Sequence, residues 1–213
     1  MEAILLGSIG VLTETSELQR QSYNEAFKYH GLDWYWNVAN YCELLKNPGG
    51  VKRLSAFGGH LIDSETILKI HKTRQSIFDS KIESGLQPRE GIVDCINYCK
   101  QNDLKLGLIT TTTPQMLNSL SNSLKKHFSF DSFDLITTKD DVSHEKPDFE
   151  VYNFALSKLK LDANQAIAIE DTEANQSAAM QAELICYLFA GEYASTQYNI
   201  NAINSIETIF SRI

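Results

Sequence analysis

Two adjacent carboxylates follow a short apolar run in the last third of the chain. Residues 166–169 are all apolar, and Glu170 and Asp171 come directly after them. A continuous apolar run of this length predicts a buried strand. Because a turn seldom needs two acids, and because Mg²⁺ takes oxygen ligands that it shares with phosphate, the pair predicts a metal site. The alternative is that one acid caps the helix that follows, and both roles could hold together.

Thr110 and Lys146 are the candidates for holding an anion. Thr110 follows the predicted strand 104–109 and is itself followed by Thr111, so its hydroxyl and the backbone N–H groups before the next helix could cradle a phosphate. Lys146 precedes a proline at a predicted helix start, where its ammonium could neutralise a phosphate oxygen. The alternatives are a polar loop that caps the helix and a solvated surface lysine.

The first apolar run, residues 3–6, ends in Gly7-Ser8-Ile9-Gly10 and carries no acid. Covalent phosphoryl transfer by a carboxylate needs a nucleophile at such a strand end and a second acid for the leaving-group proton. Gly7 has no side chain, and Ile9 can neither take nor give a proton. Ser8 has no evident base, and in an extended chain its side chain points away from those of positions 7 and 9. Its hydroxyl is expected to bond to nearby backbone instead.

Alternating strands and helices must position these residues. From residue 85 onward the pattern is typical of a doubly wound, Rossmann-like parallel sheet in an α/β fold. The predicted strands are 3–6, 104–109, 133–136, 166–169 and 184–189, and the predicted helices are 92–99, 114–124, 148–159 and 173–181, with a last short segment at 203–210. Ligands bind beyond the carboxyl ends of such strands, so the candidate residues are expected to meet at one edge of the sheet.

Residues 17–85 show helical spacing of apolar residues and no convincing strand. The predicted helices are 16–29, 38–45, 51–57 and 62–82, with a turn at Asn47-Pro48-Gly49-Gly50. The aromatic run Trp34-Tyr35-Trp36 is expected to pack inside this region rather than to form an interface. We therefore expect an α/β core made of residues 1–16 and 86–213, and a helical insertion made of residues 17–85.

Composition limits the partners. The 213 residues carry a formal net charge of −8 without a cluster of Lys and Arg, which argues against nucleic acid and anionic membranes as partners. The four cysteines form no C-x-x-C pair and no zinc pattern, so free thiols in a reducing compartment are expected. No apolar run approaches 18 residues, and the first residues lack a signal-peptide pattern. Together these features predict a cytoplasmic protein.

The order of these motifs resembles the haloacid dehalogenase (HAD) superfamily over nearly the whole chain. The features that carry the resemblance are a first strand followed by Gly-Val-Leu-Thr-Glu-Thr, a strand ending at Thr110, Lys146 before proline, and an apolar strand ending in Glu170-Asp171. The helical insertion resembles the C1 cap of the β-phosphoglucomutase-like subgroup. The segments 22–27, 31–36 and 49–53 are similar to those of CbbY-type proteins, which are phosphatases of sugar phosphates and bisphosphates.

The resemblance implies a role for each matching residue of the core. Thr110, with Thr111 beside it, and Lys146 would hold a phosphate. Asp171 and Glu170 would hold Mg²⁺. The implied partner is a phosphorylated small molecule, a sugar phosphate.

In the cap of this subgroup, a Gly-Gly-x-x-Arg loop sits over the active site and contacts the distal part of the substrate. The matching residues, together with the acid after the first turn, are Glu14, Gly49, Gly50, Lys52 and Arg53. Lys52 and Arg53 could pair with a second phosphate or an acid group, the alternative being ordinary surface charge at a helix start. His71 and Arg74 resemble a His-x-x-Lys pattern in the last cap helix.

The first motif departs from the family. The family's nucleophile aligns with Gly7 and its acid/base residue with Ile9, so no catalytic residue is assigned. The Mg²⁺ site normally uses the nucleophile carboxylate, the backbone carbonyl of the acid/base residue and the aspartate that matches Asp171, so loss of the first carboxylate predicts a weakened site. Losing a covalent nucleophile costs several orders of magnitude in rate. We therefore expect a pseudo-enzyme that keeps a phosphate- or phosphosugar-binding pocket.

Two alternatives remain open at this point. An active Mg²⁺-dependent phosphosugar phosphatase would need rearranged chemistry, with Glu14 or Glu170 activating water. A structural or interaction protein would keep only a vestigial cleft.

Overall fold

The computed structural model describes residues 1–7, 9–46, 49–194 and 201–213. The expectations for Ser8 and for the Asn47-Pro48 part of the predicted turn lie outside the described residues. No described helix is long and apolar enough to cross a membrane. All four cysteines are free, and three of them are buried, namely Cys95, Cys99 and Cys186.

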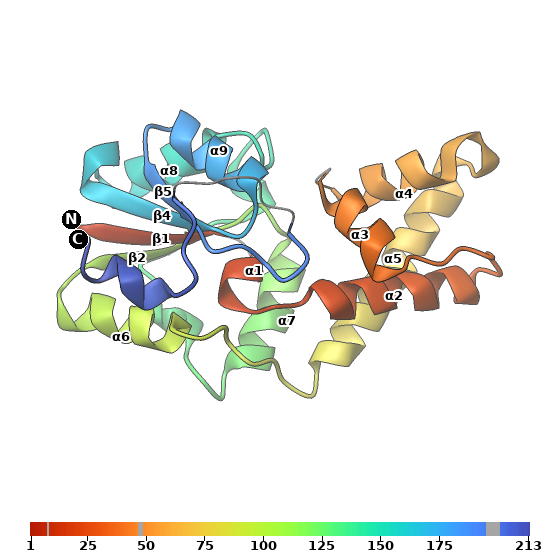
Figure 1. Cartoon of the computed structure of the whole chain (residues 1–213), viewed down its shortest axis with the longest axis horizontal. Coiled ribbons are helices and arrows are strands. Elements are labelled where there is room, and N and C mark those ends of the chain that lie inside the picture. Colours follow the sequence, from red (N-terminus) through yellow and green to blue (C-terminus); the bar gives the residue numbers. More distant parts are fainter. Residues whose placement is uncertain (8, 47–48, 195–200) are drawn as a thin grey trace.

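A parallel sheet forms the centre of the chain (Figure 1). Its strands are β1 (Ala3–Gly7), β2 (Lys105–Ile109), β3 (Leu135–Ile136), β4 (Ala166–Glu170) and β5 (Ile185–Leu188). They run in the order β3-β2-β1-β4-β5, which confirms the predicted α/β fold with a parallel sheet. In the register, Gly7 pairs with Ile109, and Leu6 pairs with Ile169. The carboxyl ends of β1, β2 and β4 therefore lie side by side.

Helices cover both faces of the sheet because alternate residues of β1 are apolar on both sides. Ile4 and Leu6 join one buried cluster, and Ala3 and Leu5 join the other. The first face is covered by α6 (Ile92–Gln101) and α7 (Pro114–Leu124), and the second by α8 (Glu150–Leu159) and α9 (Glu173–Gln181). These two layers lie below and above the sheet in Figure 1.

Several short elements differ from the sequence prediction. The first strand does not run into an irregular turn but into α1 (Ile9–Leu12), whose one turn is extended by a bond from Thr13 N–H to the Ile9 carbonyl. The last short segment contains a 3₁₀ turn at Ile206–Ile209, which packs against α6. The 3₁₀ turns are Gly59–Leu61, Phe130–Ser132, Lys139–Asp141, Ala163–Gln165 and Ile206–Ile209.

Four helices between α1 and α6 form a separate group, which we call the helical unit (right in Figure 1). They are α2 (Ser16–Tyr29), α3 (Val38–Leu45), α4 (Gly50–Gly58) and α5 (Ser64–Ile82). Their buried residues form an aromatic cluster of their own. Trp36 is its centre: it is fully buried, and its ring lies 4.6 Å from Tyr23 and 4.9 Å from Phe27. Tyr35, next to it, is exposed.

Replacing Trp36 tests whether this aromatic cluster stabilises the helical unit. Trp36→Ala is expected to lower the free energy of unfolding by about 3–5 kcal/mol, because it removes a large buried ring and leaves a cavity. Leu61→Ala is the matched control, since Leu61 is 88% exposed and its truncation is expected to cost less than about 0.5 kcal/mol. Urea denaturation followed by circular dichroism measures both. Equal losses in the two variants would contradict the assignment.

Candidate functional site

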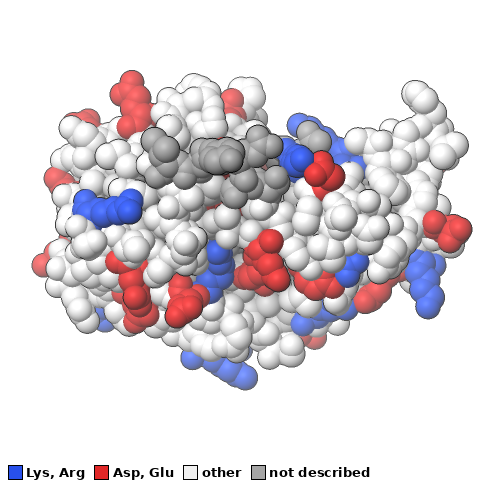
Figure 2. Space-filling model, viewed as in Figure 1, with Lys and Arg blue, Asp and Glu red and all other residues white. Residues whose placement is uncertain are grey.

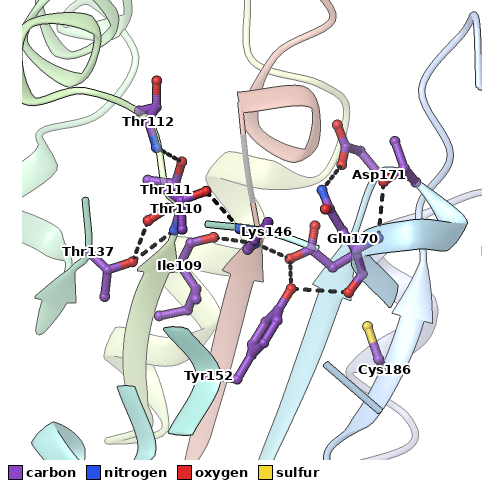
Figure 3. A network of polar contacts seen from close by, with 12 residues as sticks. Ile109, Thr110, Thr111, Thr112, Thr137, Lys146, Tyr152, Glu170, Asp171 and Cys186 are labelled. Atoms are coloured by element: carbon purple, nitrogen blue, oxygen red, sulfur yellow. Dashed lines mark hydrogen bonds and ion pairs between the residues drawn. The ribbon is translucent and has the colours of Figure 1, made fainter. Parts of the chain in front are cut away.

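Glu170, the last residue of β4, lies at the centre of a polar cluster at the carboxyl edge of the sheet (Figure 3). Its side chain is fully buried. Its Oε1 accepts hydrogen bonds from Lys146 Nζ at 2.5 Å and from the Tyr152 hydroxyl at 2.5 Å. Its Oε2 has no hydrogen-bond partner in the described part of the chain. We call Glu170, Lys146 and Tyr152 the strand-end cluster.

Lys146 joins the ends of two strands. Its Nζ donates to the Ile109 carbonyl at 2.6 Å as well as to Glu170, and its backbone N–H donates to Thr111 Oγ1 at 3.2 Å. Only 6% of its side chain is exposed. Lys146 is therefore not a solvated surface lysine, and two of its three ammonium donors are already used by β2 and β4.

Gly7 makes room for the Glu170 carboxylate. A Cβ atom built on Gly7 would lie 1.9 Å from Oε1 and 2.3 Å from Oε2 of Glu170. Because real Cβ atoms do not approach oxygens so closely, the carboxylate occupies the volume that any side chain at position 7 would need. A carboxylate is thus present at this strand end, but it comes from β4. The resemblance implied one on β1, at the position that Gly7 occupies.

Burial dominates the electrostatics of this cluster. It raises the pKa of Glu170, and the Lys146 ammonium opposes that rise. Burial also raises the pKa of Tyr152 well above its ordinary value, with the Glu170 carboxylate acting in the same direction. Tyr152 therefore keeps its proton at neutral pH and acts as a hydrogen-bond donor to Glu170.

The threonines after β2 are bonded to one another and to the backbone. Thr110 is buried, its N–H donates to Thr137 Oγ1 at 2.9 Å, and its Oγ1 accepts from the N–H of Thr112 at 3.1 Å. The helix cap is Thr113, whose Oγ1 accepts from the N–H of Met116. The predicted capping role thus belongs to Thr113. The Thr110 hydroxyl can still donate, but its N–H is no longer available to an anion.

The two acids of the predicted weakened Mg²⁺ site, Asp171 and Glu170, differ in how far they are engaged. Asp171 Oδ1 accepts from the side-chain amide of Asn175 at 3.4 Å, and its Oδ2 lies against Gly10, 2.1 Å from where a Cβ would be. Mg²⁺ needs an octahedron of oxygen ligands, whereas Glu170 is paired with an ammonium and a phenol. Across residues 1–7, 9–46, 49–194 and 201–213, no three His, Cys, Asp or Glu side chains are grouped to hold a metal.

The helix after β4 is capped by a hydroxyl, so the capping role considered for Glu170 or Asp171 is wrong. Thr172 is the N-cap residue of α9, and its side chain accepts from the N–H of Asn175. Both acids are left for other roles.

Two residues of the first turn connect the sheet edge to its surroundings. Ile9 is half-buried in α1 and packs against the core, where the family places a proton-relaying acid. Glu14 accepts from the N–H of Ser16 at 2.8 Å and from the N–H of Glu192 at 2.6 Å. Both oxygens of Glu14 are therefore engaged by backbone donors.

Arg89 carries no signal in the sequence, yet it ties three segments together. Its guanidinium donates to the carbonyls of Gly10, Phe189 and Ala190 at 2.7–2.8 Å and lies 3.4 Å from the centre of the Phe189 ring. Burial lowers its pKa, an effect that Glu14 and Asp171 oppose. Because its three partners are at least 79 residues away in the chain, local spacing could not reveal them.

A second group of polar side chains lies inside the helical unit. We call it the helical-unit cluster, and its members are Tyr23, Tyr41, Arg53, His71 and Arg74. All but His71 are less than a tenth exposed. Three of its polar atoms have no hydrogen-bond partner within the described ranges: the Tyr41 hydroxyl, His71 Nδ1 and Arg74 Nε. Buried polar groups of this kind are normally satisfied, so their gathering makes this cluster a candidate ligand site.

Cations and aromatic rings alternate in the helical-unit cluster. The Arg74 guanidinium lies 4.9 Å from the centre of the Tyr23 ring, and that of Arg53 lies 5.8 Å from the centre of the Tyr41 ring. Arg53 Nε also donates to the Leu44 carbonyl at 2.9 Å. Burial raises the pKa of Tyr41, so its hydroxyl remains a donor.

The loop predicted to contact the distal part of a substrate borders this cluster. Gly49 has a φ of 94°, a conformation that favours glycine, and it is the N-cap residue of α4. A Cβ on Gly50 would lie 2.6 Å from the Tyr23 hydroxyl and 2.7 Å from His71 Cε1. Lys52 is exposed, which agrees with ordinary surface charge, whereas Arg53 is buried.

Tyr193, from the α/β part of the chain, contacts the helical-unit cluster. It follows β5 by five residues, its hydroxyl donates to Glu17 Oε2 at 2.8 Å, and its ring lies 6.3 Å from that of Tyr41. Just before it, the N–H of Gly191 donates to the Asp171 carbonyl. A segment of the α/β part thus leads from Asp171 to the helical-unit cluster. In Figure 2, blue side chains gather at the upper edge, where the helical unit on the right meets the sheet on the left.

Comparison with known proteins identifies relatives over nearly the whole length. A sequence profile described as haloacid dehalogenase-like hydrolase matches residues 10–188. Protein CbbY of Cereibacter sphaeroides is 34% identical over 197 residues, which cover 91% of this chain and 86% of the relative. Protein CbbY of Rhodobacter capsulatus is 33% identical over 91% of this chain and 87% of the relative.

Solved structures give the same result. The crystal structure of CbbY from Rhodobacter sphaeroides in complex with phosphate matches with a TM-score of 0.85 and 32% identity, covering 96% of this chain and 94% of that chain. A variant of that protein, crystallised with xylulose-(1,5)bisphosphate, matches equally well. β-Phosphoglucomutase from Clostridium difficile shares the fold with a TM-score of 0.74 at 18% identity, covering 100% of this chain and 96% of that chain.

The buried ion pair predicts a specific pattern of stability. Lys146→Met is expected to lower the free energy of unfolding by about 3–5 kcal/mol, because it leaves Glu170 buried without its cation. The double variant Lys146→Met with Glu170→Met is expected to recover most of that loss, since apolar groups of similar volume can replace a buried pair. Urea denaturation of the single and double variants measures the difference. A double variant no more stable than Lys146→Met would argue against a direct pair.

His71 predicts a pH dependence of stability. Burial, then Arg74 and Arg53, lower its pKa from 6.5 to about 4. Between pH 6.5 and pH 4 the imidazole of His71 is protonated in the unfolded chain but not in the folded chain. The free energy of unfolding is therefore unaffected by His71 above pH 6.5 and falls as the pH drops from 6.5 towards 4. His71→Gln is expected to shrink the loss of stability between pH 7.5 and pH 5 by about 1 kcal/mol, after allowance for the partial exposure of the ring. Parallel losses in both proteins, measured by thermal unfolding, would refute the assignment.

Proposed function

This chain belongs to the haloacid dehalogenase-like hydrolase family, and from that premise we propose that it binds a phosphorylated sugar without performing the aspartate-based phosphatase reaction. The observation that carries this proposal is the position of the Glu170 carboxylate in the space above Gly7. A carboxylate that attacks phosphorus must face the substrate. That of Glu170 is fully buried and is held by Lys146 and Tyr152.

The second acid of the reaction is also missing. Protonation of a leaving group needs an ionisable side chain within hydrogen-bond reach, and Ile9 supplies none. Glu14 could replace it only by releasing the N–H groups of Ser16 and Glu192. The rearranged phosphatase is for this reason the less favoured candidate.

The family's phosphatases typically use Mg²⁺. In this chain Glu170 is engaged by Lys146 and Tyr152, which leaves Asp171 as the remaining carboxylate, and the proposed function contains no step that depends on the ion. We propose that binding is independent of metal.

We propose that the helical unit acts as a cap and supplies the principal anion site. In this proposal residues 17–85 form the cap, and residues 1–16 and 86–213 form the core. Arg53 and Arg74 offer the planar, permanently charged groups that suit phosphate, and the Tyr41 hydroxyl offers an unpaired donor. The relative from Rhodobacter sphaeroides has been crystallised with phosphate and with a sugar bisphosphate. This supports a sugar phosphate as the class of ligand.

Thr110, Thr111, Gly49, Gly50 and Lys52 are proposed to border the same ligand. The free state of all four cysteines suits a reducing compartment, which we propose to be the cytoplasm.

Ligand binding and turnover test the proposal separately. Xylulose 5-phosphate is expected to raise the melting temperature of the protein by mass action. Arg74→Met is expected to weaken binding at least tenfold, about 1.4 kcal/mol, because a charged hydrogen-bond donor is lost. Lys72→Met is the matched control: it removes the same charge two residues away on α5, from an exposed side chain. Calorimetric titration of the three proteins gives the ratio.

Release of inorganic phosphate from the same sugar phosphate, with Mg²⁺ present, is expected to stay at the level of the reaction without protein. Turnover at ordinary enzyme rates that is lost in Glu170→Gln would replace the proposal with the rearranged phosphatase. Absence of any stabilisation by phosphosugars would instead favour a structural role.

A further inference from the structure

The segment that follows β5 crosses from the α/β part of the chain to the helical unit. We call residues 189–194 the strap, and its blue trace extends toward α3 in Figure 1. Its base is fixed on the sheet, because the N–H of Phe189 donates to the Glu170 carbonyl at 2.8 Å. Its far end is Tyr193, a half-buried residue that packs against the aromatic cluster of the helical unit. The strap thus spans the junction between the two parts.

The strap meets the helical unit at Glu17, in the first turn of α2. The Tyr193 hydroxyl donates to Glu17 Oε2 at 2.8 Å, and the Tyr193 ring lies 6.3 Å from that of Tyr41 on α3. Arg20 holds the acceptor in place, since it donates to both oxygens of Glu17 at 2.6 and 2.7 Å and to the Trp36 carbonyl at 2.7 Å. The bonds from Arg20 lower the pKa of Glu17 to about 2. Glu17 is therefore ionised at neutral pH, and its bond from Tyr193 is charge-assisted.

Arg89 anchors the base of the strap. Its guanidinium donates to the carbonyls of Phe189 and Ala190, and to that of Gly10 in the first turn, at 2.7–2.8 Å. Its backbone N–H donates to the Leu12 carbonyl at 2.9 Å. One residue thus joins the base of the strap to the turn that leads into the helical unit and to the chain that returns from it.

A second contact between the two parts, that of α5 with α7, is of a different kind. Phe78 and Ile82 of α5 belong to the same buried cluster as the apolar residues of α7. Ser123 Oγ on α7 also donates to the Ile82 carbonyl at 2.9 Å. Separation here would expose large apolar side chains to water, which is unfavourable. Release of the strap exposes only the half-buried Tyr193, so relative motion of the two parts is expected to break the strap contact first.

We propose that Tyr193 holds the helical unit closed against the α/β part, and that the two parts open by pivoting about the α5–α7 contact when the Tyr193 hydroxyl leaves Glu17. The contact suits reversible release. Glu17 keeps its ion pair with Arg20 after release, and 37% of its side chain is already exposed, so opening leaves no unpaired buried charge. Because Tyr41 of the helical-unit cluster is fully buried and contacts Tyr193, release also removes part of the cover of that cluster.

Double electron–electron resonance between two spin labels measures the separation of the two parts. The labels are attached through Leu61→Cys in the helical unit and Met180→Cys on α9, at positions that are 88% and 52% exposed. Cys42→Ser removes the half-buried cysteine, and the other three are buried. With Tyr193 in place, one narrow distance distribution is expected. Tyr193→Ala is expected to raise the ratio of open to closed molecules about tenfold or more, and so to add a population at longer distance, because it removes both the charged hydrogen bond and the ring contact.

Two further variants make the result specific. Tyr193→Phe keeps the ring and loses the hydroxyl, so it is expected to give a smaller open fraction than Tyr193→Ala. Tyr29→Ala is the matched control: it removes a tyrosine that is 76% exposed from the helix that carries Glu17, and it is expected to leave the distribution unchanged. Identical distributions with and without Tyr193, or an equal change in Tyr29→Ala, would overturn the inference. These measurements use no phosphosugar, so failure of the proposed function would show separately, in the titrations described above.

Discussion

A buried ion pair between Lys146 and Glu170 organises the carboxyl edge of the sheet. The ammonium holds the ends of β2 and β4 together, since it donates to the Ile109 carbonyl and to the Glu170 carboxylate. Tyr152, from α8, adds a third element to the same oxygen. The side chain of Lys146 is 6% exposed and that of Glu170 is 0% exposed. Burying two charges in this way lowers stability unless the ions are paired and their remaining hydrogen bonds are made. The order of the surrounding loops depends on this pair.

Much of the fold could be predicted because its signals are local. Short apolar runs ended by Thr110 and by Glu170 predict parallel strands, and the parallel register then brings their ends together. The partners of the site could not be predicted in the same way. Lys146 reads as a surface lysine until its contacts, 24 and 37 residues away, are known. The role of Arg89 could not be predicted for the same reason, since its partners are at least 79 residues away in the chain.

In the helical unit, too, the sequence predicts the helices but not the polar contacts between them. Its apolar spacing predicts the helices, and aromatic residues such as Tyr23 and Tyr41 read simply as core. Only the packing reveals that the Tyr41 hydroxyl, His71 Nδ1 and Arg74 Nε are buried without a hydrogen-bond partner in the described part of the chain. A sequence pattern records which side chains are apolar but not which polar atoms remain unpaired. Such a candidate site is found only when the hydrogen-bond partners of each buried polar atom are identified in the folded structure.

The occupied space above Gly7 also constrains how this chain can change by mutation. A Cβ atom at position 7 would lie 1.9–2.3 Å from the Glu170 carboxylate, so a side chain there requires that carboxylate to move. The two positions are coupled, and the effect of a substitution at one depends on the residue at the other. A substitution at Gly7 alone therefore displaces a buried carboxylate. Substitutions at position 7 and at position 170 are therefore expected to be tolerated as a pair more readily than the one at position 7 alone.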